Sequence, residues 1–250
     1  MLPRIRFVLV NPSHPGNIGA AARAMKVMGL RDLVLVEPES FPDSKATAMA
    51  TDAVDLLEQA RVVKTLKEAL EGCTYVFATT ARPRTMAWTG SDARGCAEFM
   101  QADHSHQYAI VFGRERSGLT NDELTLSQAH VTIPTADDFH SLNLAQAVQV
   151  LAYECMMAAR DATPVTQPEA QAPEDRPVSM EELAGYFDHL KRVLIRIQFI
   201  KESQSDTLMR RMRRLYNRSQ LSITELNILR GILSDVTYAL NNPEAFHESE

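Results

Sequence analysis

Short apolar runs alternate with helix-like segments along most of the chain. Residues 5–10 and 33–36 are rich in Val and Leu, as strands buried on both faces of a sheet tend to be. A helical pattern runs between them from about Ile18 to Met28, and Gly29 supplies the expected helix stop. These three segments predict a βαβ unit.

The alternation continues to Cys155. We expect helices over 52–59, 65–71 and 121–126, and strands near Val62 and over 75–79, 108–112 and 131–133. Apolar residues from Leu144 to Cys155 then recur at helical spacing and form one stripe. This pattern predicts an α/β domain with a mainly parallel sheet.

The composition changes after residue 162. Residues 163–177 contain four prolines among Gln, Glu and Ala, which is typical of a linker. Beyond it, two Ser-x-x-Glu sequences beginning at Ser179 and Ser222 have the spacing of helix capping boxes. We therefore predict a first domain over 1–162, a linker over 163–177, and a module of about three helices over 178–250.

Charge separates these two parts. The 250 residues are 45% hydrophobic and 23% charged, which is ordinary for a globular protein, and the formal net charge is −6. Residues 186–232 nevertheless hold ten Lys or Arg and four acids, a net charge of +6. The helical module is therefore expected to carry a basic face inside an acidic protein.

Cysteine and histidine spacing limits the chemistry. The three cysteines form no Cys-x-x-Cys pair, so we expect buried, reduced thiols. The histidines lack metal-ligand spacing, and we predict no metal. No stretch has the pattern of a signal peptide or the length of a membrane span. We expect a cytoplasmic protein with no membrane partner.

A loop rich in Gly, Pro and Asn joins the first strand to the first helix over residues 11–23. Such a junction points backbone N–H groups toward an anion. The loop has Gly-x-x-Gly instead of Gly-x-Gly-x-x-Gly, which disfavours a dinucleotide site although Glu37 ends the second strand. Arg23 by itself fits a solvated helix residue.

Three more segments that may carry chemistry lie at the ends of predicted strands, over residues 79–84, 111–120 and 133–145. The carboxyl ends of parallel strands meet at one edge of a sheet, where ligands commonly bind. For the three segments in turn, the alternatives to a ligand site are an exposed arginine pair, a surface turn, and helix caps at Ser141 and Asn143. Capping alone does not explain the three junctions at 11–23, 111–120 and 133–145, so both a ligand site and surface turns stay open at this point.

Three segments resemble, in order and separation, the motifs of the SpoU branch of the SPOUT methyltransferases: 17–25, 112–121 and 141–148. With the linker and the basic tail, the pattern is most similar to the TrmJ type of tRNA (cytidine/uridine-32)-2′-O-methyltransferase. The resemblance implies an α/β SPOUT methyltransferase domain with a parallel sheet and a carboxyl-half trefoil knot, followed by a small all-helical module. It also implies S-adenosyl-L-methionine as cofactor, tRNA as partner and a homodimer.

The resemblance also implies site residues. Arg23 matches the family's essential arginine near the ribose hydroxyl, and Asn17, Glu115, Ser141 and Asn143 would support the active-site geometry. A guanidinium is effectively always protonated, so we prefer Arg23 as an electrostatic stabiliser of the developing alkoxide over the family's usual proposal of a base. The expected cofactor pocket comprises Thr79, Thr80, Ala81, Gly113, Ile133, His140, Ser141 and Leu142.

Arginines are expected to bind the RNA backbone, giving affinity and orientation more than sequence information. A solvated basic helix is the alternative for the tail. The motifs also allow a 2′-O-methyltransferase acting on another tRNA position or on ribosomal RNA; the ordered motifs disfavour a non-catalytic RNA-binding protein. The predicted RNA-binding residues are Arg82, Arg84, Arg114, Arg116, Arg210, Arg211, Arg213, Arg214 and Arg218.

Overall fold

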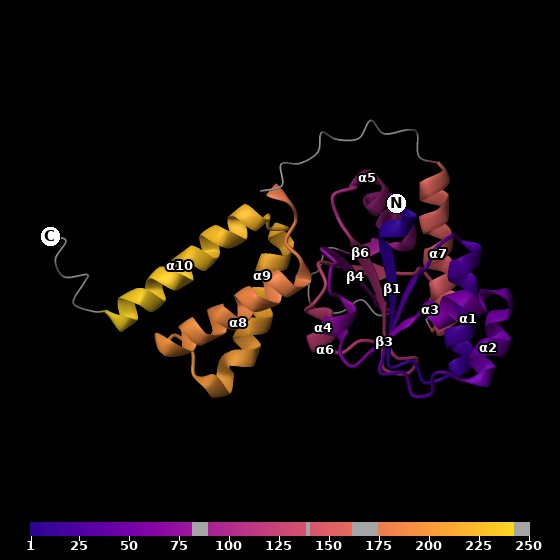
Figure 1. Ribbon diagram of the computed structural model, residues 1–250, viewed down its shortest axis with the longest axis horizontal. Helices are drawn as coiled ribbons and strands as arrows, with labels where there is room; N and C mark the ends of the chain where they lie inside the picture. The colour runs from indigo at the N-terminus through magenta and orange to yellow at the C-terminus, as the bar shows by residue number, and fades with distance from the viewer. Residues whose placement is uncertain (82–89, 139–140, 162–174, 243–250) are drawn as a thin grey trace. The chain divides into compact units, whose positions relative to one another are not determined.

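The computed structural model describes residues 1–81, 90–138, 141–161 and 175–242. The chain divides into two compact units, Met1–Thr166 and Gln167–Glu250. Figure 1 traces both units. Most of the predicted linker, together with Arg82, Arg84 and His140, lies outside the described residues.

The first unit is built on a seven-stranded sheet with the order β3-β2-β1-β6-β4-β7-β5, in which every recorded pairing is parallel. The predicted parallel α/β domain is therefore confirmed. The strands are β1 Ile5–Val10, β2 Asp32–Val36, β3 Arg61–Val63, β4 Tyr75–Thr79, β5 Gly90–Asp92, β6 Tyr108–Phe112 and β7 Ala129–Thr132.

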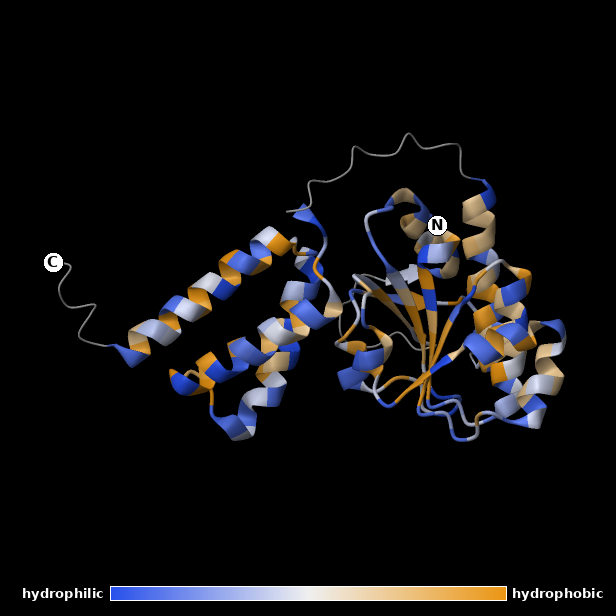
Figure 2. Cartoon of the chain, in the orientation of Figure 1, coloured by the Kyte–Doolittle hydropathy of each residue, from blue (hydrophilic) through white to orange (hydrophobic). Residues whose placement is uncertain are grey.

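Helices cover both faces of this sheet. Figure 1 shows α1, α3 and α7 on one side of the strands and α4 and α6 on the other. Successive residues of β1 point to opposite faces of the sheet. Ile5, Phe7 and Leu9 lie on the face covered by α1, α5 and α7 and belong to the core there. Figure 2 shows that the central strands are strongly hydrophobic. The helices are α1 Pro15–Val27, α2 Ser44–Ala50, α3 Val54–Gln59, α4 Leu66–Ala69, α5 Ala93–Ala102, α6 Asn121–Leu124 and α7 Leu144–Arg160, with short 3₁₀ turns η1 Leu2–Arg4 and η2 Thr51–Ala53.

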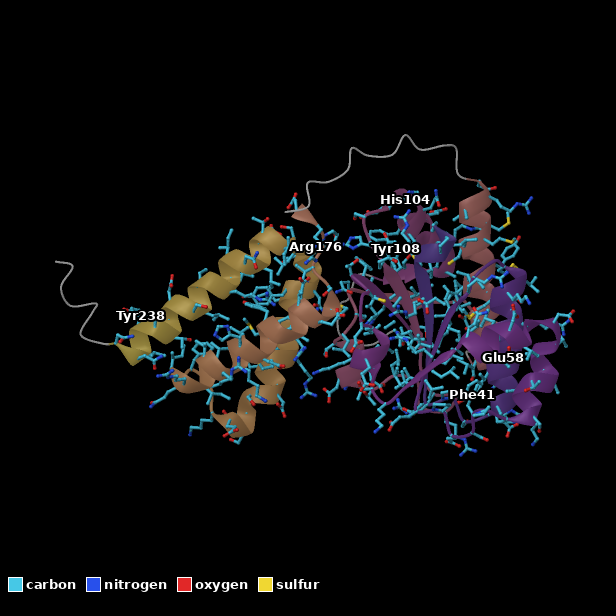
Figure 3. The ribbon with its side chains drawn as sticks, viewed as in Figure 1. Phe41, Glu58, His104, Tyr108, Arg176 and Tyr238 are labelled. Carbon is cyan, nitrogen blue, oxygen red and sulfur yellow. The ribbon has the colours of Figure 1, made fainter. Side chains whose placement is uncertain are left out.

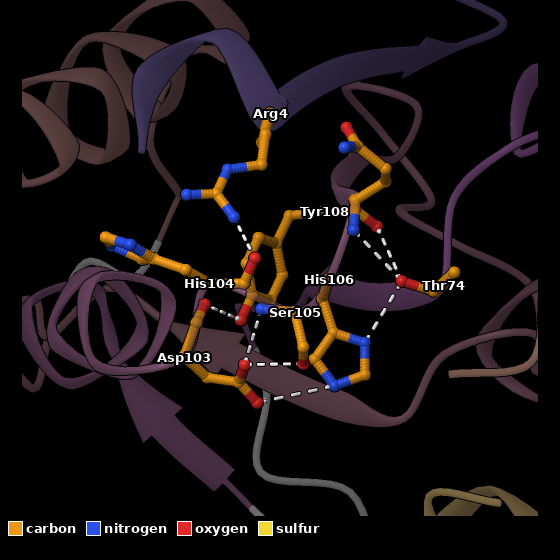
Figure 4. Close-up of polar contacts among 8 residues, drawn as sticks. Arg4, Thr74, Asp103, His104, Ser105, His106 and Tyr108 are labelled. Carbon is orange, nitrogen blue, oxygen red and sulfur yellow. Dashed lines mark hydrogen bonds and ion pairs between the residues drawn. The ribbon is translucent and has the colours of Figure 1, made fainter. Parts of the chain in front are cut away.

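A polar cluster closes the amino-terminal ends of β4 and β6 (Figure 4). The Asp103 carboxylate accepts hydrogen bonds from the Ser105 N–H at 2.8 Å and hydroxyl at 2.6 Å, and its backbone carbonyl accepts one from the Tyr108 hydroxyl at 2.7 Å. The His106 ring lies between Asp103 (3.5 Å) and the Thr74 hydroxyl (3.0 Å). Burial lowers the pKa of His106 despite the nearby carboxylate. The cluster fixes the turn between α5 and β6.

The second unit contains the predicted helices α8 Met180–Arg196, α9 Ser205–Ser219 and α10 Ile223–Asn241, with a 3₁₀ turn η4 Glu202–Gln204. Both predicted capping boxes are confirmed, at Ser179 for α8 and at Ser222 for α10. Tyr186 and Phe187 are central to an apolar core shared by the three helices. Arg176, labelled in Figure 3, pairs with Glu182 through two bonds of 3.0 and 2.6 Å. This pairing with Arg176 lowers the pKa of Glu182 to about 2.

The three cysteines are buried free thiols, as predicted. Burial raises the pKa of Cys96, and likewise raises the pKa of Cys155 to about 12, so neither favours the reactive thiolate form. No helix within the described ranges is long and apolar enough to cross a membrane.

Candidate functional site

The three motif loops meet at the carboxyl-terminal edge of the sheet. They follow β1, β6 and β7, and the loop after β4 joins them because β4 lies between β6 and β7. The parallel pairing of these strands brings all four loops to one side, as the sequence predicted.

A chain of hydrogen bonds joins one residue from each motif. The Asn17 side-chain amide donates to the Glu115 carboxylate at 3.1 Å, and the Asn143 amide donates to the Asn17 side-chain oxygen at 3.0 Å. The Ser13 N–H and hydroxyl also donate to Glu115, at 3.2 and 3.1 Å. The structure therefore brings together three of the five predicted catalytic residues.

Local sequence fixes both ends of this chain. Asn143 is the cap of α7: its side-chain oxygen accepts from the Ala145 N–H at 2.9 Å, and its own N–H donates to Gln146 at 3.3 Å. Burial alone would raise the pKa of Glu115, but hydrogen bonds from Asn17 and Ser13 outweigh it, and the pKa lies below its ordinary value. Glu115 is therefore a carboxylate acceptor at neutral pH.

Arg114 stabilises the loop that carries Glu115 through hydrogen bonds to other residues of the protein. Its guanidinium makes two bonds of 3.0 Å to the Glu123 carboxylate and also donates to the Asn11 side chain. The Arg114 backbone pairs with Gly118, whose φ of +67° suits glycine. Because these bonds occupy much of the guanidinium, Arg114 has a structural role, and its RNA contact stays a prediction.

A first hollow of about 650 Å³ opens beside Glu115, within the size range of ligand pockets. Its walls combine apolar side chains such as Phe112, Val131 and Leu144 with the polar loop 113–118. Arg116 also lines it and is exposed. The described members of the predicted cofactor set all line this hollow: Thr79, Thr80, Ala81, Gly113, Ile133, Ser141 and Leu142.

A second hollow of about 590 Å³ lies where α1, α2 and α7 meet. Asn17 and Asn143 line this hollow, whereas their partner Glu115 lines the first one. The hydrogen-bonded chain is thus part of the boundary of both hollows.

Arg23 lines neither hollow. It is exposed on α1 and makes no hydrogen bond or ion pair with another described residue. Arg23 follows Asn17 by six residues on the helix, a rise of about 9 Å. Ser141, the remaining predicted catalytic residue, is exposed and lines the first hollow.

The tail arginines lie on α9 in two environments. Arg211 and Arg218 are exposed. Arg213 places its guanidinium 4.7 Å from the centre of the Phe187 ring, and Arg210 donates to Thr207 at 3.3 Å. Arg214 is half-buried. Part of this basic face therefore also stabilises the helical unit.

Sequence reasoning missed several residues around the site. Asn11, Ser13 and Glu123 support the polar loops, and Lys45 and Met49 line the second hollow. The Thr-x-x-Glu spacing ending at Glu123 was a detectable signal, since it forms a capping box on α6. The contacts of the other four depend on the fold.

Comparisons with known proteins agree with this geometry. The model of the SpoU rRNA methylase family matches residues 4–153, and that of the carboxyl-terminal domain of the tRNA methyltransferase TrmJ matches residues 181–245. A Pseudomonas aeruginosa relative, named tRNA (cytidine/uridine/adenosine-2′-O-)-methyltransferase TrmJ, is 52% identical over 244 residues, 94% of each chain.

Solved structures give the same result. The crystal structure of TrmJ from Z. mobilis has a TM-score of 0.82 at 34% identity, covering 95% of this chain and all of that one. A structure described as giving insights into 2-OH methylation of C/U34 on tRNA has a TM-score of 0.52 at 28% identity, covering 63% of this chain and 97% of that one. The chain therefore belongs to the SpoU methylase family, in the branch that carries the TrmJ carboxyl-terminal domain.

Proposed function

We propose that this protein transfers a methyl group from S-adenosyl-L-methionine to the ribose 2′-oxygen of nucleotide 32 in the tRNA anticodon loop. The relative from P. aeruginosa is named for 2′-O-methylation of tRNA and covers 94% of this chain. The observation that carries the proposal is the Glu115–Asn17–Asn143 chain, which joins all three motifs between two hollows.

The first hollow fits the proposed cofactor. It combines apolar walls suited to an adenine ring with hydroxyl and backbone groups of Thr79, Thr80 and Gly113 suited to polar recognition. A Cβ on Gly113 would lie 2.3 Å from the Gly118 carbonyl carbon, so only glycine allows the loop to fold back this closely. When bound, the cofactor supplies an electrophilic methyl group on a sulfonium.

The chain's own residues orient and polarise the acceptor. Glu115 stays ionised and holds Asn17 through one bond, so the remaining polar atoms of Asn17 and Asn143 are fixed in direction. Arg23 brings a permanent positive charge to α1, and we assign it the stabilisation of negative charge on the ribose oxygen. The transfer would release the demethylated thioether of the cofactor, and the hydroxyl proton would pass to solvent water and not to Arg23, whose guanidinium is already protonated.

A homodimer and a knot are part of the proposal. Val27 on α1 and Tyr153 on α7 are 66% and 44% exposed, and these helices pack side by side, which supports an apolar subunit contact. In the sheet β4 pairs with β6 and β7 instead of its sequence neighbours, an order compatible with a trefoil knot in the carboxyl half of the unit. A Val27→Asp variant should sediment as a monomer if this surface forms the dimer.

The basic face of α9 would hold the tRNA backbone. With tRNA as the proposed substrate, we also propose that the protein acts in the cytoplasm. Position 34 is the second candidate target, favoured by the neighbour described for C/U34. We prefer position 32 because the resemblance to the TrmJ type implies it and the TrmJ carboxyl-terminal domain matches residues 181–245, whereas the neighbour described for C/U34 covers only 63% of this chain.

The proposal is tested by transfer of tritium from labelled S-adenosyl-L-methionine to total tRNA, with the product mapped by nuclease digestion and mass spectrometry. We expect a 2′-O-methylated nucleotide at position 32, lost in Arg23→Ala and retained in Arg61→Ala. Arg61 is the matched control because it is also exposed, on the edge strand β3. Methylation at position 34 would favour the second candidate, and no methylation of any tRNA would overturn the proposal.

A further inference from the structure

Large apolar side chains are exposed at one end of the helical unit. Phe199 and Ile197, on the turn between α8 and α9 (residues 197–201), are 66% and 42% exposed. Tyr238, labelled in Figure 3, is 57% exposed in the last turn of α10. The Arg196 guanidinium, in the last turn of α8, donates to the Asn241 side chain, so the carboxyl-terminal ends of α8 and α10 lie together. The α8–α9 turn and Tyr238 therefore belong to the same end of the unit.

Backbone hydrogen bonds fix the α8–α9 turn. The Phe199 N–H donates to the Leu194 carbonyl and the Gln198 N–H donates to the Ile195 carbonyl, each at 3.0 Å. These two bonds form a Schellman motif, with Gln198 at the left-handed position (φ +58°) that glycine usually occupies. The residue after this position commonly packs back on the helix. Here Leu194 packs against the core of the unit, while the Phe199 ring stays exposed.

Positive charge flanks this turn. Residues 189–201 contain Lys or Arg at four positions and no Asp or Glu. Three of the four, Arg192, Arg196 and Lys201, are exposed and form no ion pair within the part of the chain that the structure describes. Glu202 is the first acid beyond the turn. The exposed aromatic ring thus has cationic side chains on both sides of it in the sequence.

The combination of an exposed ring and unpaired cations selects the kind of partner. A single exposed apolar residue is ordinary on a protein surface, so exposure alone indicates no function. An unpaired nucleotide complements both features, because its base stacks on an aromatic ring and its phosphates attract Lys and Arg. The bases of a double helix are already stacked and paired, so they are not free to stack on the ring. The same turn of a second copy of this chain would bring like charges and be repelled.

We propose that the α8–α9 turn binds an unpaired nucleotide of the tRNA, with its base stacked on Phe199 and neighbouring phosphates at Arg192 and Lys201. This assignment rests on the proposed function, which supplies tRNA as the substrate. It adds a stacking contact to the phosphate contacts proposed for α9, which begins at Ser205 just beyond the turn. Phosphate contacts carry no sequence information directly, whereas a stacked base must come from a loop or another unpaired segment. The helical unit would thereby distinguish such a segment from double-helical RNA.

Equilibrium binding of total tRNA to the full chain tests this assignment. Phe199→Ala should raise the Kd for tRNA about 10-fold through loss of one stacked base. Since the ring is neutral, the slope of log Kd against log salt concentration should stay the same. Phe199→Trp should keep the parental affinity, whereas Phe199→Leu should not, because leucine is apolar but cannot stack. Ile228→Ala is the matched control: Ile228 is 62% exposed on α10, and Glu225 lies one helical turn before it. Its Kd should equal that of the parent.

The remaining outcomes separate stacking from other contacts. Replacing both Arg192 and Lys201 by Gln should lower the salt slope by about 2, and an unchanged slope would contradict the phosphate contacts. An unchanged Kd in Phe199→Ala would overturn the assignment. So would full restoration by Phe199→Leu, which would assign the turn to an apolar contact with protein. A chain that methylates tRNA although Phe199→Ala binds normally contradicts only this assignment. A chain that needs Phe199 to bind tRNA but transfers no methyl group contradicts only the proposed function.

Discussion

The contact between Gly19 and Ala46 makes a quantitative prediction. In Gly19→Ala the new Cβ would lie 2.0 Å from a backbone oxygen, and ordinary contact begins at 3.4 Å, so α2 must move away by about 1.4 Å. Because the obstacle is backbone and not a flexible side chain, we take the upper end of overpacking costs, about 3 kcal/mol. Alanine offsets about 1 kcal/mol of this through its higher helix propensity. The net loss of stability is about 2 kcal/mol.

Gly231→Ala is the matched control, because Gly231 lies inside α10 with nothing within 4 Å of its added Cβ. There only the helix propensity acts, and we expect a gain of up to about 1 kcal/mol. Urea unfolding of the full chain followed by circular dichroism measures both. A Gly19→Ala protein as stable as the Gly231→Ala protein would refute the reasoning.

Three other perturbations probe separate parts of the molecule. Arg176 lowers the pKa of Glu182 to about 2, so the ion pair stabilises the helical unit above pH 4.5 and this contribution is lost as the pH falls toward 2. Glu182→Gln should therefore flatten the acid limb of the pH–stability curve, and an unchanged acid limb would contradict the pairing. Arg114→Met leaves the half-buried Glu123 carboxylate without its two bonds to the guanidinium, and should lower the free energy of unfolding, measured by thermal unfolding, by about 1–2 kcal/mol. A variant as stable as the parent would show that the pair is solvated. Replacing both Arg211 and Arg218 by Gln should lower the slope of log Kd for tRNA against log salt concentration by about 2, measured from low to moderate salt. An unchanged slope would show that these residues of α9 do not contact the tRNA.

The sequence was most informative where pattern and burial agree. β1, β4 and β6 have the predicted bounds, since apolar runs in a parallel sheet are buried on both faces. The helix α2 was not predicted, because its buried residues Ala46 and Ala50 are too small to create an apolar stripe. The edge strand β5, with the sequence Gly-Ser-Asp, was missed because it has little intrinsic β propensity.

Two helices, α5 and α1, also differ from the prediction. α5 was not predicted, although Ala93, Cys96, Ala97 and Met100 are buried at helical spacing. Three of these four side chains are small, and they form no long apolar run. The helix predicted from Ile18 begins three residues earlier, because Pro15 is favourable in the first turn.

The site could be predicted only in part. The meeting of the motif loops follows from parallel pairing, so the proximity of Asn17 and Glu115 was foreseeable. The engagement of Arg114 by Glu123 was not, because the same arginine also fits a phosphate contact. The second hollow depends on α2, an element for which the sequence offered no periodic signal.

The hydrogen-bonded chain at the sheet edge also bears on how the protein folds. Its two bonds join residues 98 and 126 positions apart in the sequence, so neither can form before most of the first unit has been synthesised. Contacts of such long range require large loops to close and develop late compared with local helices. During translation, the polar wall would therefore assemble only after Asn143 has left the ribosome, and a nascent chain ending before that residue would have a partly formed sheet but no complete site.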